Sequence, residues 1–252
     1  MKNLIFGLIA VLLSLNCFGQ LNETNVGEFH NEKMDLYYSY LENIAKTKEK
    51  NAIKKSDFYD MFTNLTLNVF GKNNPELSAS TNSEFLKYLD LTFEQQVDES
   101  VNKINKVTTI SQELKSFLIS IIVDCRKVNN NQVNINYLKS KMVEARQKFS
   151  GNELKIIEVS LNTGVSSFYY WDNNYDKWEN VFGTARTVRK PPVNVGVADL
   201  AGATVGALYG AVGGTAFLPG VGTVTGAIGV GLAGGLYSST VAAAVNFFSV
   251  FF

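Results

Sequence analysis

Apolar residues recur every three or four positions through most of residues 29–168, a spacing typical of amphipathic helices. A strand-like alternation is nowhere sustained. A charged helix with one apolar stripe must bury that stripe against another element, so the pattern predicts an all-α fold that begins with a bundle of five or six amphipathic helices. The expected stripes lie within residues 29–44, 58–69, 85–104, 114–122, 138–149 and 157–168.

Capping boxes mark three of the expected helix starts. In such a box, a Ser or Thr and a Glu or Gln three positions later bond free backbone N–H groups of the first turn. The boxes pair Thr81 with Glu84, Thr109 with Gln112, and Ser150 with Glu153. The run of asparagines at positions 129–131 is typical of a loop, and it separates two of the predicted helices.

The last part of the chain, residues 193–252, differs from the rest in composition, because Asp199 is its only charged residue. Small residues recur there at four-residue spacing, so they form one smooth stripe along a helix. They are Ala198, Gly202, Gly206, Gly210 and Gly214. Glycine costs about 1 kcal/mol relative to alanine inside a helix, so a close packing partner or a membrane is expected to compensate.

Two apolar arms make up this segment, and the sequence around Pro219 and Gly220 is expected to break the helix between them. Residues 195–217 and 223–252 are each long enough to cross a bilayer, so a C-terminal Gly-rich helical hairpin is predicted. Asp199 is expected near the start of the first arm, where the helix dipole favours a carboxylate. Further helix-packing positions are Gly222, Gly226, Gly231, Gly235 and Ser239. Alternatively, the hairpin is the buried centre of a helical domain.

Aromatic residues are concentrated between positions 168 and 182, where both tryptophans of the chain lie. Trp and Tyr favour the headgroup level of a bilayer, so this cluster predicts an interfacial belt that leads into the apolar hairpin. The alternative is that these rings fill the core of the helical bundle, with their polar tips bonded at its edge. The predicted interfacial residues are Tyr169, Tyr170, Trp171, Tyr175 and Trp178.

The N-terminus predicts export. Lys2 precedes an apolar run at residues 4–15, which is the organisation of a secretory signal, and the run is shorter than the roughly 20 residues that a spanning helix needs. We expect cleavage before Gln20, with cleavage just after Gln20 as the alternative. An uncleaved anchor and a lipid-modified Cys17 are further alternatives, and residues 14–16 match a lipobox poorly. The expected destination is the outer membrane, the cell envelope or the exterior.

The distribution of charge divides the chain into three predicted parts. Residues 1–19 form the signal peptide, residues 20–190 a charged α-helical domain, and residues 191–252 the Gly-rich apolar hairpin. Two consecutive prolines, Pro191 and Pro192, lie at the boundary between the last two parts, and they cannot continue a helix.

Residues suited to catalysis are scarce, so we expect a protein that is not an enzyme and binds no cofactor, metal or evident small-molecule substrate. His30 is the only histidine and is expected on the surface of an early helix. Cys125 follows an apolar run and is expected to be a buried, structural thiol. Basic and acidic residues are equal in number, 23 each, so no net charge attracts nucleic acid.

Residues 199–243 resemble the glycine-zipper segments of small membrane-active bacteriocins and of envelope proteins that carry a glycine-zipper domain. This resemblance implies membrane insertion, oligomerisation and, for some members, killing of neighbouring cells. Amphipathic helices followed by an apolar hairpin are also similar, in architecture, to colicin-type pore-forming domains.

The sequence therefore predicts an exported protein whose partners are membrane lipid and other copies of itself, through the glycine faces. A bacteriocin-like pore-forming toxin is one form of this function. The alternative is a structural or interaction protein of the envelope, in which the hairpin is an anchor or a buried core.

Overall fold

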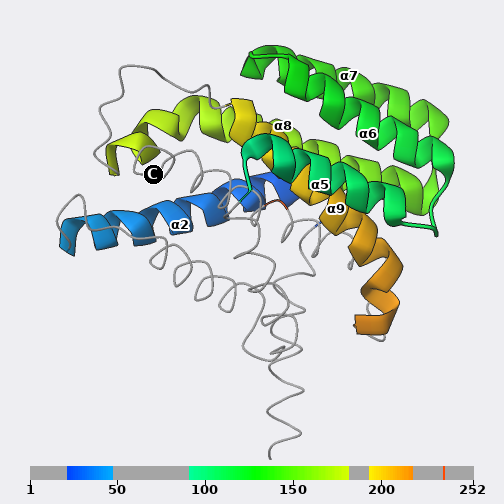
Figure 1. Ribbon diagram of the computed structural model, residues 1–252, viewed down its shortest axis with the longest axis horizontal. Helices are drawn as coiled ribbons and strands as arrows, with labels where there is room; N and C mark the ends of the chain where they lie inside the picture. The colour runs from blue at the N-terminus through cyan, green and yellow to red at the C-terminus, as the bar shows by residue number, and fades with distance from the viewer. Residues whose placement is uncertain (1–21, 48–90, 182–192, 218–234, 236–252) are drawn as a thin grey trace, which may run out of the picture.

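The computed structural model describes residues 22–47, 91–181, 193–217 and Gly235 (Figure 1). The all-α prediction is confirmed for this part of the chain, where six helices pack as a bundle and no strand occurs. These helices are α2 (Val26–Thr47), α5 (Phe93–Lys106), α6 (Gln112–Lys127), α7 (Asn131–Lys148), α8 (Gly151–Val181) and α9 (Val193–Phe217). The predicted signal peptide, the helix at 58–69, the Pro191–Pro192 boundary and the second hairpin arm lie outside the described residues.

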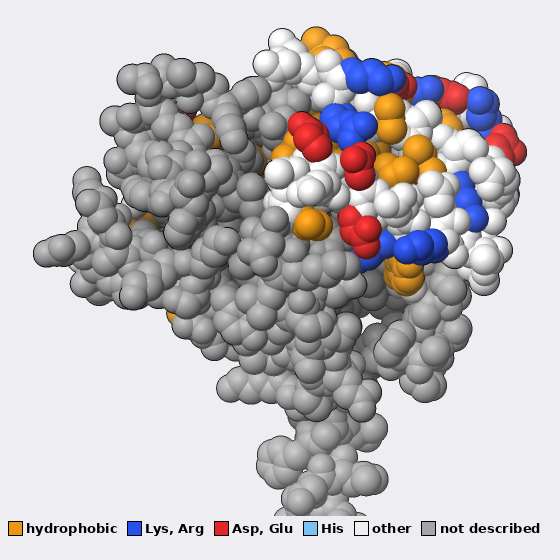
Figure 2. All heavy atoms as spheres, in the orientation of Figure 1, with side chains coloured by type: hydrophobic (Ala, Val, Ile, Leu, Met, Phe, Trp, Pro, Cys, Tyr) orange, Lys and Arg blue, Asp and Glu red, His pale blue; other side chains and the backbone are white. Residues whose placement is uncertain are grey.

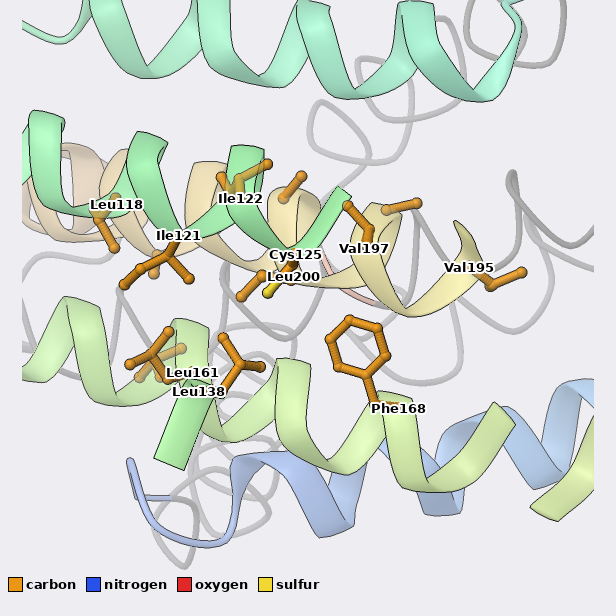
Figure 3. Packing of buried hydrophobic residues seen from close by; sticks show 14 of the residues in the cluster. Leu118, Ile121, Ile122, Cys125, Leu138, Leu161, Phe168, Val195, Val197 and Leu200 are labelled. Atoms are coloured by element: carbon orange, nitrogen blue, oxygen red, sulfur yellow. The ribbon is translucent and has the colours of Figure 1, made fainter. Parts of the chain in front are cut away.

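Helix α8, which is 31 residues long, is the centre of the arrangement (Figure 1). It contacts α2, α7 and α9 along its length. Helix α9 also contacts α5 and α6, so it lies between α8 on one side and α5 with α6 on the other. The same order of α6, α9, α8 and α2 is visible at close range in Figure 3.

Side-chain caps fix the starts of three described helices, α5, α6 and α7. The box predicted at Thr81 and Glu84 lies outside the described residues. Helix α5 begins after Thr92, whose hydroxyl accepts a bond from the Gln95 N–H while the Gln95 side chain bonds the Thr92 N–H. The apolar stripe predicted over residues 85–104 therefore does not belong to one continuous helix. The cap of α6 is Ser111, which bonds Leu114 N at 3.0 Å, so the box predicted at Thr109 is wrong by two residues.

The predicted box at Ser150 is also modified by tertiary contact. Glu153 Oε1 accepts a bond of 3.1 Å from the backbone N–H of Ser111, at the start of the neighbouring helix α6. The asparagine loop, by contrast, is confirmed, because Asn130 is the N-cap of α7 and its side chain bonds Val133 N at 3.0 Å.

The core joins the predicted stripes to α9, whose residues 195–204 are buried on all faces of the helix (Figure 3). Met34, Leu118, Leu138 and Leu161 are at most 1% exposed and represent α2, α6, α7 and α8. From α9, the fully buried or nearly fully buried apolar residues are Val195, Val197, Leu200, Ala201, Ala203, Ala207 and Leu208. This part of the first hairpin arm is thus core of the bundle, and Cys125 is buried among its neighbours as predicted.

Membrane crossing was expected of the first arm from its length. None of the helices in the described ranges has the combination of length and apolar character that crossing a bilayer requires.

Charged residues of both signs cover the outer faces of α5, α6 and α7 (Figure 2). Some link neighbouring helices, as Arg126 of α6 does with Asp98 of α5 at 2.7 Å and Arg146 of α7 with Glu158 of α8 at 2.9 Å. Surface ion pairs of this kind contribute about 1 kcal/mol or less. The bundle is therefore held together chiefly by the burial of its apolar stripes.

Glycines allow α8 and α9 to come close together. A Cβ atom at Gly196 of α9 would lie within 3.0 Å of three ring carbons of Phe168, and a Cβ at Gly164 of α8 would lie 2.9 Å from Leu200 Cδ1. Phe168 and Leu200 are fully buried, so neither side chain has free space to move into. Close glycine packing is present, and these two contacts involve glycines outside the predicted stripe.

We expect Gly196→Ala to destabilise the protein by about 1–3 kcal/mol, because the added methyl group overpacks the Phe168 ring. Helix propensity alone favours alanine by about 1 kcal/mol, so propensity and packing predict opposite signs. Urea unfolding followed by circular dichroism measures the difference. As a control, the same substitution in a Phe168→Leu background should cost less. A stabilised Gly196→Ala variant would contradict the close packing.

Candidate functional site at the junction of α2, α8 and α9

Asp199, the single charged residue of residues 193–252, is fully buried in the bundle. Its Oδ2 atom accepts a hydrogen bond of 3.1 Å from Trp171 Nε1 and another from the Ser167 hydroxyl, both on α8. The expectation that the helix dipole stabilises this carboxylate is wrong, because α9 begins at Val193 and has no acidic residue in its first turn. Donors from the neighbouring helix stabilise it instead.

His30 of α2 lies beside this carboxylate and is also fully buried, so its predicted place on the surface is wrong. Its Nε2 atom is 3.8 Å from Asp199 Oδ2. On the other side of the ring, Nδ1 is 3.0 Å from Asn31 Oδ1, and the Asn31 amide donates to the Ser166 carbonyl at 2.9 Å. Asn31 thus links the His30 ring to α8, and the other side of the ring faces Asp199 of α9.

Helical periodicity explains how these groups meet. On α2, His30 shares a face with Met34 and Tyr37, which are core residues. On α8, four polar or aromatic residues with helical spacing form one fully buried row: Ser160, Thr163, Ser167 and Trp171. The small side chains in this row allow α9 to approach α8 closely. Ser167 and Trp171 donate hydrogen bonds to Asp199 of α9.

Burial determines the protonation state of His30. Desolvation lowers its pKa from 6.5 to about 4, and hydrogen bonds to Asn31 and to the Gly235 backbone oppose this only in part. The ring is therefore neutral at pH 7. Because the unfolded chain binds a proton more readily than the folded one between pH 6.5 and pH 4, this group makes the fold less stable as the pH falls through that window.

Of the predicted helix-packing residues, those on the described part of α9 are buried, namely Ala198, Gly202, Gly206 and Gly210. Gly214 belongs to α9, while Gly222, Gly226, Gly231 and Ser239 lie outside the described residues. Gly235 lies where α2, α8 and α9 meet. A Cβ atom there would be 3.0 Å from Thr163 Cγ2, 3.4 Å from His30 Cδ2 and 3.5 Å from Ala203 Cβ.

The predicted interfacial aromatics are mostly inside the bundle. Tyr170, Trp171, Tyr175 and Trp178 are at most 5% exposed, whereas Tyr169 is 38% exposed. This is the arrangement of the alternative in which the rings fill the core.

Polar atoms of this aromatic cluster find partners near its edge. Trp178 Nε1 donates to the Tyr170 hydroxyl at 3.1 Å, which donates to Asp35 of α2 at 3.1 Å. Lys177 also reaches Asp35, at 3.1 Å, and its ammonium lies 4.0 Å from the centre of the Tyr38 ring. The aromatic end of α8 is therefore a second attachment for α2.

The arrangement of Ser167, Asp199 and His30 is suited to joining helices rather than to hydrolysis. In a Ser-His-Asp site the histidine lies between the other two, whereas here the Ser167 hydroxyl donates to Asp199 directly. All three side chains are fully buried. Among the residues that the structure describes, no group of acids, histidines and cysteines is arranged to hold a metal ion. Comparisons with protein-family models, curated proteins and solved structures find no match to this chain.

We expect Ser167→Ala to destabilise the protein by about 2 kcal/mol, because it removes a donor from a buried carboxylate. Ser160→Ala is the matched control, since Ser160 is equally buried on α8 but bonds the Ile156 carbonyl of its own helix. It should cost clearly less. Urea unfolding of both variants at pH 7 checks this, and equal losses would show that Asp199 does not depend on its α8 donors.

Proposed function

We propose that the protein is an exported, non-enzymatic, membrane-active protein that stores its Gly-rich segment against a bundle of amphipathic helices. On release, this segment associates with membrane lipid and self-assembles through its glycine faces. A bacteriocin-like pore-forming toxin is one form of this activity. Neither nucleic acid nor a small-molecule substrate has a part in it.

The observation that carries this proposal is the enclosure of α9. Val195, Leu200, Ala203 and Leu208 are fully buried between α8 and the pair α5 and α6, which carry charged side chains outward. An apolar helix that will later meet lipid needs such a cover while it is in water. Amphipathic helices can provide one, because each turns its apolar stripe inward and its charges outward.

The sequence beyond α9 supports the same function. Residues 218–252 contain no charged side chain and continue the small-residue rows, through positions such as Gly231, Gly235 and Ser239. Glycine rows allow helix backbones to approach closely in lipid, where van der Waals packing drives association. Because Gly202, Gly206 and Gly210 are buried in the bundle, they become available to another copy only when α9 leaves its place.

The second candidate is a structural protein of the cell envelope in which α9 is permanent core. The close fit of Gly164 and Gly196 against α9 and α8 side chains favours it, because such packing stabilises the bundle. The two candidates differ in one property: whether α9 must separate from α8 for the protein to act on a membrane.

A disulfide between α8 and α9 tests this property. A Cβ at Gly164 would lie 3.3 Å from Leu200 Cβ, close to the roughly 3.5–4.5 Å found in disulfides, and cysteine at position 200 removes the Leu200 branch that a Cβ at 164 would meet. The native thiol of Cys125 is buried, and burial raises its pKa to about 12, so it will not compete for oxidation.

We expect the oxidised Gly164→Cys/Leu200→Cys variant to release no dye from vesicles of phosphatidylethanolamine and phosphatidylglycerol, because its α9 cannot leave α8. Reduction should restore release and the formation of oligomers, measured after detergent extraction. The control is Leu200→Cys alone, which cannot form the bond and should act the same in both redox states.

Equal release by the oxidised and reduced double variant would contradict a function that requires α9 to leave. If neither variant nor the native protein releases dye or binds the vesicles, the permanent-core candidate is favoured.

A further inference from the structure

We propose that the outward side of α7, together with Tyr169 of α8, is the surface by which the protein docks on an anionic bilayer before α9 leaves the bundle. This inference rests on the proposed function, and it adds the class of lipid that is recognised and the part of the bundle that meets it. We call this surface the α7 face, and it consists of Val133, Lys139, Val143, Arg146, Lys148 and Tyr169.

The α7 face exposes apolar side chains that the core of the bundle does not use. Val143 is 58% exposed, Val133 50% and Tyr169 38%, and these are three of the five large apolar side chains that the described part of the chain exposes. Positions 133, 136, 140 and 143 follow one side of the helix, whereas Leu138 on the other side is buried. Helix α7 is thus apolar on two sides, and only one of them is needed to cover the core.

The charges of α7 are mostly positive. The helix carries four basic residues and a single acidic residue, Glu144. Glu144 is half-buried and accepts bonds of 2.7 Å from both Lys141 and Lys148, so one carboxylate faces two ammonium groups. The residues of α7 that are both charged and exposed are all cations, namely Lys139, Arg146 and Lys148. The α7 face is therefore basic, although the whole chain has no net charge.

Carboxylates of the neighbouring helices reduce this charge toward the end of α7. Glu158 of α8 pairs with Arg146 at 2.9 Å, and the charge of Glu113 of α6 acts on Lys148. Surface ion pairs of this kind are weak, so an anionic bilayer can compete with these carboxylates for the same cations.

Lys139 lies between Val133 and Val143 in the sequence, and its partner is neutral. Its ammonium donates to the Tyr169 hydroxyl at 3.1 Å and lies 5.2 Å from the centre of the Tyr169 ring. An exposed cation beside an exposed tyrosine suits the headgroup region of a bilayer, where the ammonium meets phosphates and the ring meets less polar surroundings. The two valines can enter the boundary between headgroups and acyl chains.

Charge complementarity identifies the partner as anionic lipid, and α2 provides the contrast. Leu36 of α2 is 46% exposed, but the charged residues exposed beside it include Glu32 and Asp35. Anionic lipid would repel such a face, whereas it attracts one that combines exposed valines with exposed cations. Helix α7 lies at the outer edge of the bundle, in contact with α6 and α8, so its face is accessible while α9 is still enclosed (Figure 1).

Flotation of the native protein with vesicles tests the choice of lipid. The protein should bind phosphatidylglycerol vesicles at low salt, and binding should weaken as salt is added, because salt screens surface charges. Phosphatidylcholine vesicles carry no net charge and should bind clearly less. Equal binding to both kinds of vesicle, or no binding to either, would overturn the proposal.

We expect Lys139→Gln to weaken binding to phosphatidylglycerol vesicles by about fivefold, because one cation near the lipid surface is lost. Lys46→Gln is the matched control: it removes an equally exposed cation from α2 and should have little effect. Circular dichroism melting checks that both variants are folded. Equal losses in the two variants would show that only the net charge matters, which would overturn the assignment to α7.

The apolar part of the surface is tested with Val133→Gln/Val143→Gln, which should weaken binding by about tenfold, because two side chains no longer favour the acyl boundary. Glutamine is a better helix former than valine, so α7 should remain folded. Leu36→Gln on α2 is the control and should bind as the native protein does. Native binding by the valine variant would mean a purely electrostatic surface suited to another polyanion, and it would overturn docking on a bilayer.

The oxidised Gly164→Cys/Leu200→Cys variant separates docking from the proposed function. Its α9 is fixed to α8 but its α7 face is unchanged, so it should bind phosphatidylglycerol vesicles as the native protein does while it releases no dye. If it binds only after reduction and Lys139→Gln has no effect, docking through α7 is overturned and membrane action through α9 stands. If it binds but the native protein releases no dye, docking is supported and the proposed function is not.

Discussion

The bundle depends on the close approach of α9 to α8. Helix α9 is rich in glycine and alanine, and such a helix offers little apolar surface per residue, so it is stabilised only if neighbouring backbones come near. Gly164 and Gly196 permit that approach, since a methyl group at either position would meet Leu200 or Phe168. Because α5 and α6 contact α9 from the other side, the amphipathic helices depend on this contact for burial of their own stripes.

A smooth helix face does not by itself define where the partner lies along it. Small residues leave shallow grooves, and a shift by one turn would place another small residue in nearly the same position. Directional bonds supply the missing register, because Ser167 and Trp171 can both reach Asp199 only in one alignment of α9 on α8. The buried carboxylate is costly to desolvate, and in return it selects one packing over its neighbours.

Local patterns predicted local structure well. The stripes of α6 and α7 gave the right helices, because capping groups such as Asn130 bond within the same few residues. The start of α5 was mispredicted because the apolar period runs through Thr92 without a break, and periodicity cannot show where a chain bends. His30 and Asp199 were both misplaced for a different reason: their partners are distant in sequence and meet only through packing. The helical spacing of the small residues Ser160, Thr163 and Ser167 was the sequence feature that could have indicated a helix packed against this face of α8.

The composition of α9 suits two environments, and Asp199 is what distinguishes them. Small residues can pack against α8 in the bundle and, in the proposed function, against another copy in lipid, so they would give neither state a large advantage. A carboxylate is different, because it needs hydrogen-bond donors or a proton wherever water is absent. In the bundle it receives donors from Ser167 and Trp171, and leaving the bundle means losing both. In the proposed membrane function, the balance between storage and insertion would therefore be concentrated at this one side chain.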